Sequence, residues 1–118
     1  MDACTNGRTY IAAMLIERLA DVNHANNNGA TALTAACLSG HTETARLLLD
    51  HGADVNRRDN DGWTALMWAC RNGLTNIARL LLDRHANVNL TNANGDTAMS
   101  LAIQNRYVDI QTMLRSKL

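Results

Sequence analysis

The sequence predicts an all-α repeat fold, an α-α solenoid in which short helical units stack on one another. The first observation is that Cys4, Cys37 and Cys70 stand 33 residues apart. The second is that the run Ala-Arg-Leu-Leu-Leu-Asp at 45–50 returns at 78–83 with the same period. A period of this length indicates units that cannot bury their apolar faces alone and therefore stack. A stack of this kind is usually a binding surface.

The period sets the organisation of the chain, which is one domain over 1–118. No Pro-, Gly- or Ser-rich linker separates the units. Each unit buries its apolar face on its neighbours, so the array has no single central core. Counted from Asn26, the units are a truncated repeat at 1–25, full repeats at 26–58 and 59–91, and a shortened C-terminal capping repeat at 92–118.

Two more strings recur in these units. Gly-x-Thr-Ala-Leu, or its variant ending in Met, begins at Gly29, Gly62 and Gly95, and Ala-Asp-Val-Asn or Ala-Asn-Val-Asn occurs at 20–23, 53–56 and 86–89. Together with the Leu-rich run, these strings resemble the ankyrin repeat over essentially the whole chain. The resemblance implies two helices and a short β-hairpin arm per unit, and a non-enzymatic domain that binds proteins.

Within each unit, the residue chemistry predicts where the first helix lies. Thr31, Thr64 and Thr97 precede short Ala/Leu-rich segments, and a threonine side chain can accept a backbone N–H at a helix start. Gly40 and Gly73 follow those segments and supply the positive φ that a tight turn between two helices requires. The first helix of a unit therefore runs from the threonine to this glycine.

A second helix and a hairpin arm complete the unit. Ile77, Leu80 and Leu81, with Ala78, recur at three- and four-residue spacing, which predicts a helix packed on one side. Asn and Asp hydrogen-bond locally and tolerate unusual backbone angles. The Asn/Asp/Gly-rich stretches that predict hairpin tips are 26–29, 59–62 and 92–95.

The two ends depart from the pattern in different ways. The second helix of the first unit carries Ile11, Met14, Leu15 and Ile16 with no preceding repeat to cover them. Two interpretations stay open: the chain is a fragment of a longer array, or another chain covers this end. At the other end, polar residues indicate a solubilising cap, namely Gln111, Thr112, Arg115, Ser116 and Lys117.

Composition argues against several classes of function. Lys and Arg together number 11, as do Asp and Glu, so the formal net charge is zero and the basic footprint of a nucleic-acid or membrane-surface protein is missing. Aliphatic runs are too short to cross a bilayer, and a secretory leader is not evident. We therefore expect a cytoplasmic or nuclear protein without nucleic-acid or membrane partners.

The cysteines and histidines do not indicate a catalytic or metal site. Cys37 lies four residues before His41, but the thiol recurs in three units beside packed alanines, which favours a core role and reduced thiols. The histidines lack ligand spacing, and His51 and His85 are expected at helix ends, where an imidazole meets free carbonyls. The glycines form no phosphate-binding loop, so we expect no enzyme activity, metal or cofactor.

In ankyrin-like proteins partners usually meet the hairpin tips and the first helices. The two full repeats agree closely except at such positions, where for example Ala30 becomes Trp63 and Leu38 becomes Arg71. This variation predicts a partner-binding face. Its predicted residues are Asn27, Asn28, Ala30, Leu38, Arg58, Asn60, Asp61, Trp63, Arg71, Asn72, Asn94 and Asp96.

Three residues near the centre of this face have open alternatives. Trp63 is the candidate aromatic anchor, or it packs on the adjacent arm. Arg71 binds a partner carboxylate, or it is a solvated surface arginine. Trp68 is expected in the core or just below the surface, with Met67 beside it, because Ala35 and Leu101 at the equivalent positions are apolar.

Further expectations follow from the resemblance and from departures from it. The proline that usually follows the capping threonine is replaced by alanine in all three repeats, so the array should be less stable than an idealised one, and substituting proline there should raise its melting temperature. Some ankyrin proteins carry hydroxylated asparagine at positions matching Asn23, Asn56 and Asn89. The chain is expected to be a monomeric interaction module; the alternative is an assembly element whose N-terminal end packs on another copy or on the rest of a longer protein.

Overall fold

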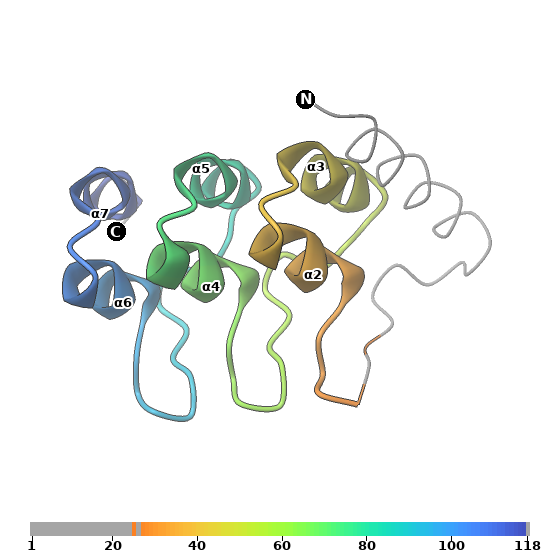
Figure 1. Cartoon of the computed structure of the whole chain (residues 1–118), viewed down its shortest axis with the longest axis horizontal. Coiled ribbons are helices and arrows are strands. Elements are labelled where there is room, and N and C mark those ends of the chain that lie inside the picture. Colours follow the sequence, from red (N-terminus) through yellow and green to blue (C-terminus); the bar gives the residue numbers. More distant parts are fainter. Residues whose placement is uncertain (1–24, 26, 118) are drawn as a thin grey trace.

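The computed structural model describes residues 25 and 27–117. Its helices form two layers, with α2, α4 and α6 in one, α3, α5 and α7 in the other, and the connecting arms projecting from the first layer (Figure 1). No strand occurs within the described residues. The helices are α2 (Ala32–Leu38), α3 (Thr42–Asp50), α4 (Ala65–Asn72), α5 (Thr75–Asp83), α6 (Ala98–Gln104) and α7 (Val108–Arg115).

This stack of three helix pairs confirms the predicted all-helical repeat fold. Predictions for the truncated first unit, including Cys4, Asn23 and the apolar residues Ile11, Met14, Leu15 and Ile16, lie outside the described residues. Within the described part, none of the helices is long and apolar enough to span a bilayer.

The predicted threonine caps hold in two repeats of the three. Thr64 Oγ1 accepts the Met67 N–H at 3.2 Å, and Thr97 Oγ1 accepts the Ser100 N–H at 3.1 Å while Ser100 Oγ accepts the Thr97 N–H at 2.9 Å. Thr31 precedes α2, but its side chain caps no backbone N–H, so that prediction was wrong. Thr31 Oγ1 instead lies 3.4 Å from Thr34 Oγ1, within hydrogen-bond distance.

The helix ends follow the glycine pattern. Gly40 and Gly73 adopt φ of +74° and +71°, as predicted for the turn between two helices, and Arg106 takes the left-handed conformation at the equivalent place in the last pair. His51 closes α3 with its ring Nδ1 2.9 Å from Leu47 O, which confirms its expected helix-end role. His85 has φ of +68° and comes two residues after Asp83, the last residue of α5.

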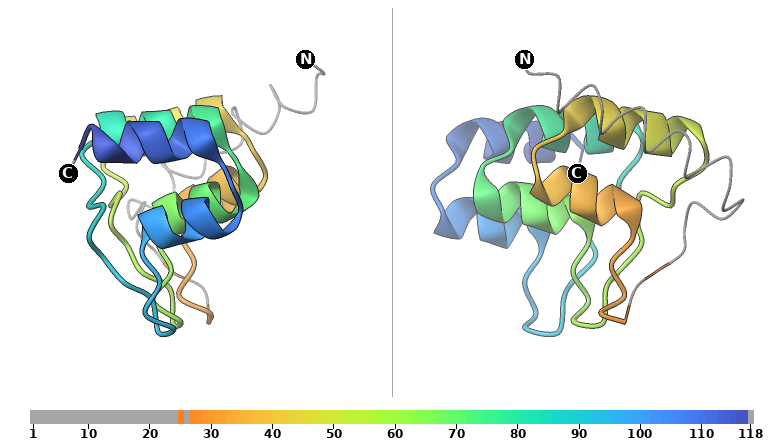
Figure 2. Two further views of the ribbon diagram at one scale, coloured as in Figure 1. Left: turned by 90° about the vertical axis from the view of Figure 1, so that its left-hand side faces the viewer. Right: turned by 45° about the vertical axis from the view of Figure 1, so that its right-hand side comes forward.

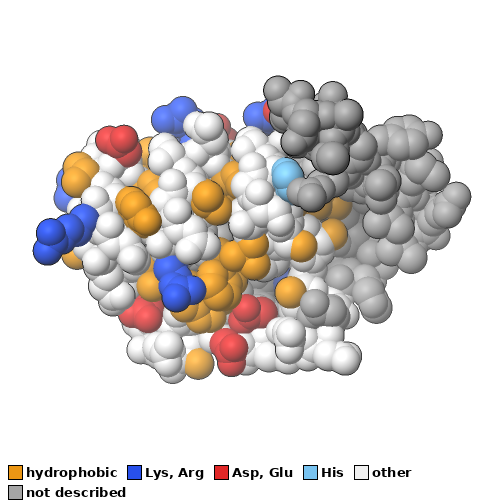
Figure 3. Space-filling model, in the orientation of Figure 1, with side chains coloured by type: hydrophobic (Ala, Val, Ile, Leu, Met, Phe, Trp, Pro, Cys, Tyr) orange, Lys and Arg blue, Asp and Glu red, His pale blue; other side chains and the backbone are white. Residues whose placement is uncertain are grey.

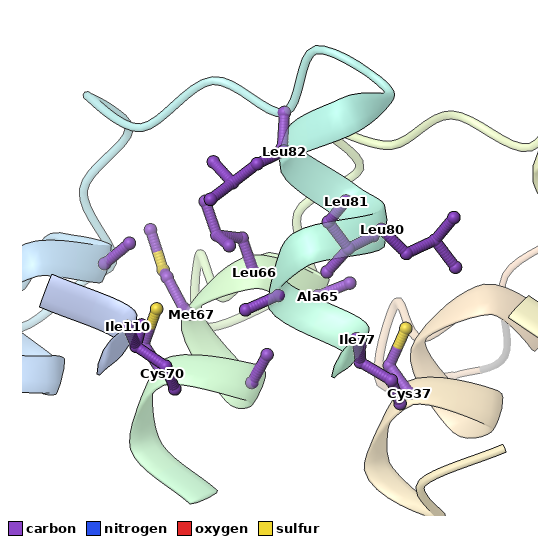
Figure 4. Close-up of a cluster of buried hydrophobic side chains, with 14 of the residues drawn as sticks. Cys37, Ala65, Leu66, Met67, Cys70, Ile77, Leu80, Leu81, Leu82 and Ile110 are labelled. Atoms are coloured by element: carbon purple, nitrogen blue, oxygen red, sulfur yellow. The ribbon is translucent and has the colours of Figure 1, made fainter. Parts of the chain in front are cut away.

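The core lies between the layers and between successive repeats. Ile77, Leu80, Leu81 and Ala78 are all buried, as predicted from their spacing. Cys37 and Cys70 are fully buried free thiols, which confirms their packing role. In Figure 4, Cys37 of α2 points into the same part of the core as Ile77 of α5, and Cys70 of α4 does so with Ile110 of α7. Each thiol thus helps to seal one repeat against the next.

The arms stand side by side and cross the direction of the helices (Figure 2). Within one arm, the Asp59 N–H donates to Trp63 O at 2.9 Å and the Gly62 N–H donates to Asp59 O at 3.0 Å, which folds the tip into a tight turn. Neighbouring arms are joined by hydrogen bonds from the Asn60 N–H to Asn28 O and from the Ala93 N–H to Asp61 O, both 2.9 Å long. The arms and α2, α4 and α6 therefore enclose one continuous face.

Candidate functional site

Two tryptophans and an arginine form a cluster at the middle of this face. The rings of Trp63, at the base of an arm, and Trp68, in α4, stack with centroids 4.2 Å apart and planes inclined by 24°. Arg71 Cζ lies 5.8 Å from the Trp63 ring centroid and 5.7 Å from that of Trp68. A guanidinium so close to two indole faces is held by cation–π attraction. We call these three residues the indole–arginine cluster.

Local structure fixes the cluster in place. The Thr64 cap sets the start of α4. Trp68 and Arg71 are three residues apart in this helix and therefore share one side of it. Trp63 immediately precedes the cap, and its backbone N–H donates to Asp59 Oδ1 at 2.9 Å. Both indoles are half-buried, whereas Arg71 is exposed.

The cluster offers hydrogen-bond donors that have no acceptor. Trp68 Nε1 is buried without a hydrogen-bond partner. Among the described residues, ion pairs join Arg46 to Glu43 and Arg84 to Asp50, and neither pair involves Arg71. The indole N–H is closed off by burial, whereas the exposed guanidinium, unpaired among the described residues, favours an incoming anion.

The equivalent positions in the neighbouring repeats carry different chemistry. In the last repeat they are Asp96 and Gln104, and Gln104 Nε2 donates to Asp96 Oδ1 at 3.3 Å. In the preceding repeat they are Ala30 and Leu38, and Leu38 is 44% exposed. Figure 3 shows hydrophobic side chains on this face with a Lys or Arg side chain against them, and Asp or Glu side chains over the arms.

The remaining predicted site residues differ in their contacts and in their exposure. Asn60 Nδ2 donates to Asn27 O at 2.7 Å, and Arg58 Nη1 donates to Thr91 O at 3.4 Å, so these side chains tie one repeat to the next. Of the twelve predicted residues, three are half-buried: Ala30, Trp63 and Asp96. The other nine are exposed: Asn27, Asn28, Leu38, Arg58, Asn60, Asp61, Arg71, Asn72 and Asn94.

The sequence reasoning missed two members of this surface. Trp68 is half-buried with its Nε1 buried, in agreement with a position just below the surface, but its stacking on Trp63 was not predicted; Met67 beside it is 1% exposed. Gln104 was not counted as a site residue, although it holds Asp96. The signal was present: residues 63 and 71 are separated by the same eight positions as 96 and 104, and Trp68 precedes Arg71 by three.

Elsewhere in the described residues the chemistry is limited. No group of three His, Cys, Asp or Glu there could hold a metal ion. A hollow of about 140 Å³ lies between two repeats, lined by residues including Gly40 and Leu74, and it is smaller than an ordinary ligand pocket. Burial raises the pKa of the Cys37 and Cys70 thiols to about 12, so neither is a thiolate at neutral pH.

The fold and this face define a class, the repeat domain that binds other proteins. A sequence model of the ankyrin repeat family, described as ankyrin repeats in three copies, matches residues 1–92 and 57–117. The chain belongs to the ankyrin repeat family. Ankyrin repeats are generally protein–protein interaction modules and are typically non-enzymatic. No curated protein matches the chain.

Proposed function

We propose that this chain is a non-enzymatic module, without metal or cofactor, that binds a protein partner on the face formed by its arms and α2, α4 and α6. The observation that carries the proposal is the indole–arginine cluster at the centre of that face. Tryptophan and arginine are the residue types most enriched among interface hot spots. Trp63 and Arg71 are therefore proposed as the main contacts.

The rigidity of the face supports the same function. Neighbouring arms are tied by backbone bonds such as the one from the Asn60 N–H to Asn28 O, and by the side-chain bond from Asn60 to Asn27 O. A surface already held in one shape loses little conformational entropy when a partner docks. The arms would then present their tips in a fixed register.

We also propose that the protein acts in the cytoplasm or nucleus. Cys37 and Cys70 are free thiols in the core, and proteins that keep several reduced cysteines are typical of reducing compartments. Microscopy of the tagged full-length protein tests this proposal, and a signal confined to the secretory pathway would contradict it.

The test of the binding function compares proteins captured from a lysate of the organism that encodes the chain. Quantitative mass spectrometry would follow the wild type, a Trp63→Ala/Arg71→Ala variant and an Asn76→Ala/Arg79→Ala control, whose altered residues are exposed on α5. We expect a partner that the wild type and the control retain and the first variant loses. Equal recovery by all three proteins would contradict the proposed face.

A further inference from the structure

We propose that the face recognises an extended peptide segment carrying an apolar, an acidic and a basic side chain at intervals of about three residues. The apolar side chain would meet Leu38, the carboxylate would meet Arg71, and the basic side chain would meet Asp96. This inference rests on the proposed function and specifies the chemistry of the partner.

The acidic contact follows from the state of Arg71. Its guanidinium is held over two rings and has no carboxylate partner among the described residues, so its N–H groups are oriented but unpaired. A carboxylate can accept two parallel N–H bonds from such a group. Trp68 Nε1 is buried, so the guanidinium of Arg71 is the donor of the cluster that a partner can reach. A partner cation would instead have to displace Arg71 from the rings.

The basic contact follows from the acidic residues next to the cluster. Asp61, at an arm tip, is exposed, and Asp96 is half-buried with one oxygen accepting from Gln104. Neither carboxylate forms an ion pair with a described residue. These charges would repel a uniformly acidic segment and would also repel nucleic acid, whose phosphates repeat along the strand. A segment of mixed charge avoids the repulsion and gains a second attraction.

The spacing follows from the repeat. Stacked helices lie about 8–10 Å apart, and an extended chain advances about 3.3 Å per residue, so one repeat corresponds to about three residues of peptide. Leu38 and Arg71 hold equivalent positions in successive repeats, and Gln104 holds that position in the next one. Asp96 supplies the acidic group there, because its Oδ1 accepts from Gln104 Nε2 at 3.3 Å. A matching segment therefore reads apolar-x-x-acidic-x-x-basic, in either chain direction.

The first experiment selects displayed random twelve-residue segments on the full chain, with the Arg71→Gln variant as counter-selection. We expect the enriched segments to share an acidic residue flanked at three-residue distance by a basic and an apolar one. Absence of enrichment, or enriched segments lacking the acidic residue, would overturn the proposed chemistry. A cellular partner that depends on Trp63 and Arg71 would still support the proposed function, so the two failures are distinguishable.

The second experiment measures affinity with defined peptides. Trp63 and Trp68 are the only tryptophans of the chain, so intrinsic fluorescence reports on the cluster itself. The matched peptides are Leu-Ser-Ser-Glu-Ser-Ser-Lys and its reversed sequence, and the exchanged peptides are the same two with Glu and Lys swapped. Two further probes are controls: a helical peptide that carries the apolar, acidic and basic residues seven positions apart, and oligothymidylate. We expect one of the two matched peptides to bind about tenfold more tightly than the peptide of the same direction in which Glu and Lys are exchanged.

A charge swap provides the matched control. The Arg71→Glu/Asp96→Lys variant should prefer the exchanged peptide, because the two contacts have been reversed together. Comparable reversal in an Arg79→Glu variant, altered on α5, would overturn the assignment, since that residue lies on another helix. Tighter binding of the helical peptide or of oligothymidylate than of either matched peptide would also overturn it.

Discussion

Gly29, Gly62 and Gly95 share one backbone angle but have different surroundings. All three adopt φ of +81°, in the left-handed region that side chains with a Cβ rarely occupy. A Cβ on Gly62 would lie 3.0 Å from Asn92 Cα and 3.1 Å from Ala93 N, whereas one on Gly95 would meet nothing within 4 Å. The close approach at Gly62 is what allows the next arm to bond to Asp61 O.

We therefore expect Gly62→Ala to be more destabilising than Gly95→Ala. Both substitutions carry the left-handed cost of about 1–2 kcal/mol, and Gly62→Ala adds about 1–3 kcal/mol because the neighbouring backbone must move. Urea denaturation followed by circular dichroism measures both free energies of unfolding. Equal losses would show that contact between the arms does not require glycine.

The buried thiols make stability depend on alkaline pH. Burial raises the pKa of Cys37 and Cys70 from 9.0 to about 12. Below pH 9 both states keep the proton, but between pH 9 and 12 the unfolded chain releases it first. The stability is therefore complete below pH 9 and is lost as pH rises towards 12, by up to about 1.4 kcal/mol per pH unit for each thiol.

The Cys37→Ala/Cys70→Ala variant isolates this effect. It loses packing at every pH, but its free energy of unfolding should fall less steeply than that of the wild type above pH 9. Denaturation at a series of pH values from 7 to 10.5 gives the two slopes. Identical slopes would mean that the folded chain admits the thiolates.

At the scale of the element, the helix starts leave room for a stabilising change. Ala32, Ala65 and Ala98 are the first residues of α2, α4 and α6, the position where proline is favoured. Thr31, with φ of −105° and ψ of 173°, already has the extended conformation that a following proline requires. Ala32 is also exposed, so a proline ring would meet solvent there.

We expect Ala32→Pro to raise stability by about 0.4–1 kcal/mol, because proline restricts the unfolded chain, and the triple variant with Ala65→Pro and Ala98→Pro to melt higher still. Ala35→Pro is the matched control: Ala35 is exposed on the same helix, but its N–H donates to Thr31 O at 3.1 Å. That variant should lose about 3 kcal/mol. Calorimetry would count against the prediction if Ala32→Pro also lowered the melting temperature.

At the scale of the whole molecule, stability depends on contacts between neighbours. α5 packs against α3, α4 and α7, whereas α7 packs mainly against α5 and α6 among the described helices. Further links join successive repeats, such as the ion pair between Arg84 Nη2 and Asp50 Oδ1 at 2.6 Å and the bond from the Asn87 N–H to Asn56 Oδ1 at 2.7 Å. Damage to the middle pair should therefore spread further than damage to the last pair.

Leu81→Ala and Leu114→Ala test this at equivalent positions, since both leucines are fully buried. Each change should cost about 2–5 kcal/mol locally. Hydrogen exchange followed by mass spectrometry should show Leu81→Ala exposing amides in α3, α5 and α7, and Leu114→Ala exposing mainly α6 and α7. The same pattern for both variants would indicate a single cooperative unit instead.

Much of the fold was predictable from the sequence because the same capping, turn and apolar residues recur in each unit. The threonine before α4 and α6, the glycines after α2 and α4, and the apolar spacing in α5 act within a few positions, so the sequence displays them directly. The side chain of Thr31 contacts the hydroxyl of Thr34 and caps no backbone N–H, although Ser100 at the equivalent position of α6 forms a capping box with Thr97. The three helix starts thus differ in the contacts of the threonine side chain, which the spacing of residues does not show.

The candidate face was predictable in outline and not in detail. Variation between repeats identified Trp63 and Arg71, but it could not reveal that Arg71 lies over the Trp63 and Trp68 rings, because that contact depends on how an arm meets a helix. Nor could it reveal that Asn60 and Arg58 bond to the neighbouring repeats. Such contacts depend on the register between units.

The repeat, the helix pairs and the burial of Cys37 and Cys70 follow from the sequence alone, because they depend on spacing and local chemistry that recur every 33 residues. Tertiary packing, by contrast, settles which surface side chains join neighbouring repeats, as Asn60 does, and which remain exposed, as Arg71 does. The physical reason is distance along the chain: the Asn60 to Asn27 bond joins residues 33 positions apart. Stacking brings such residues together, and the stacking geometry is a property of the assembled units.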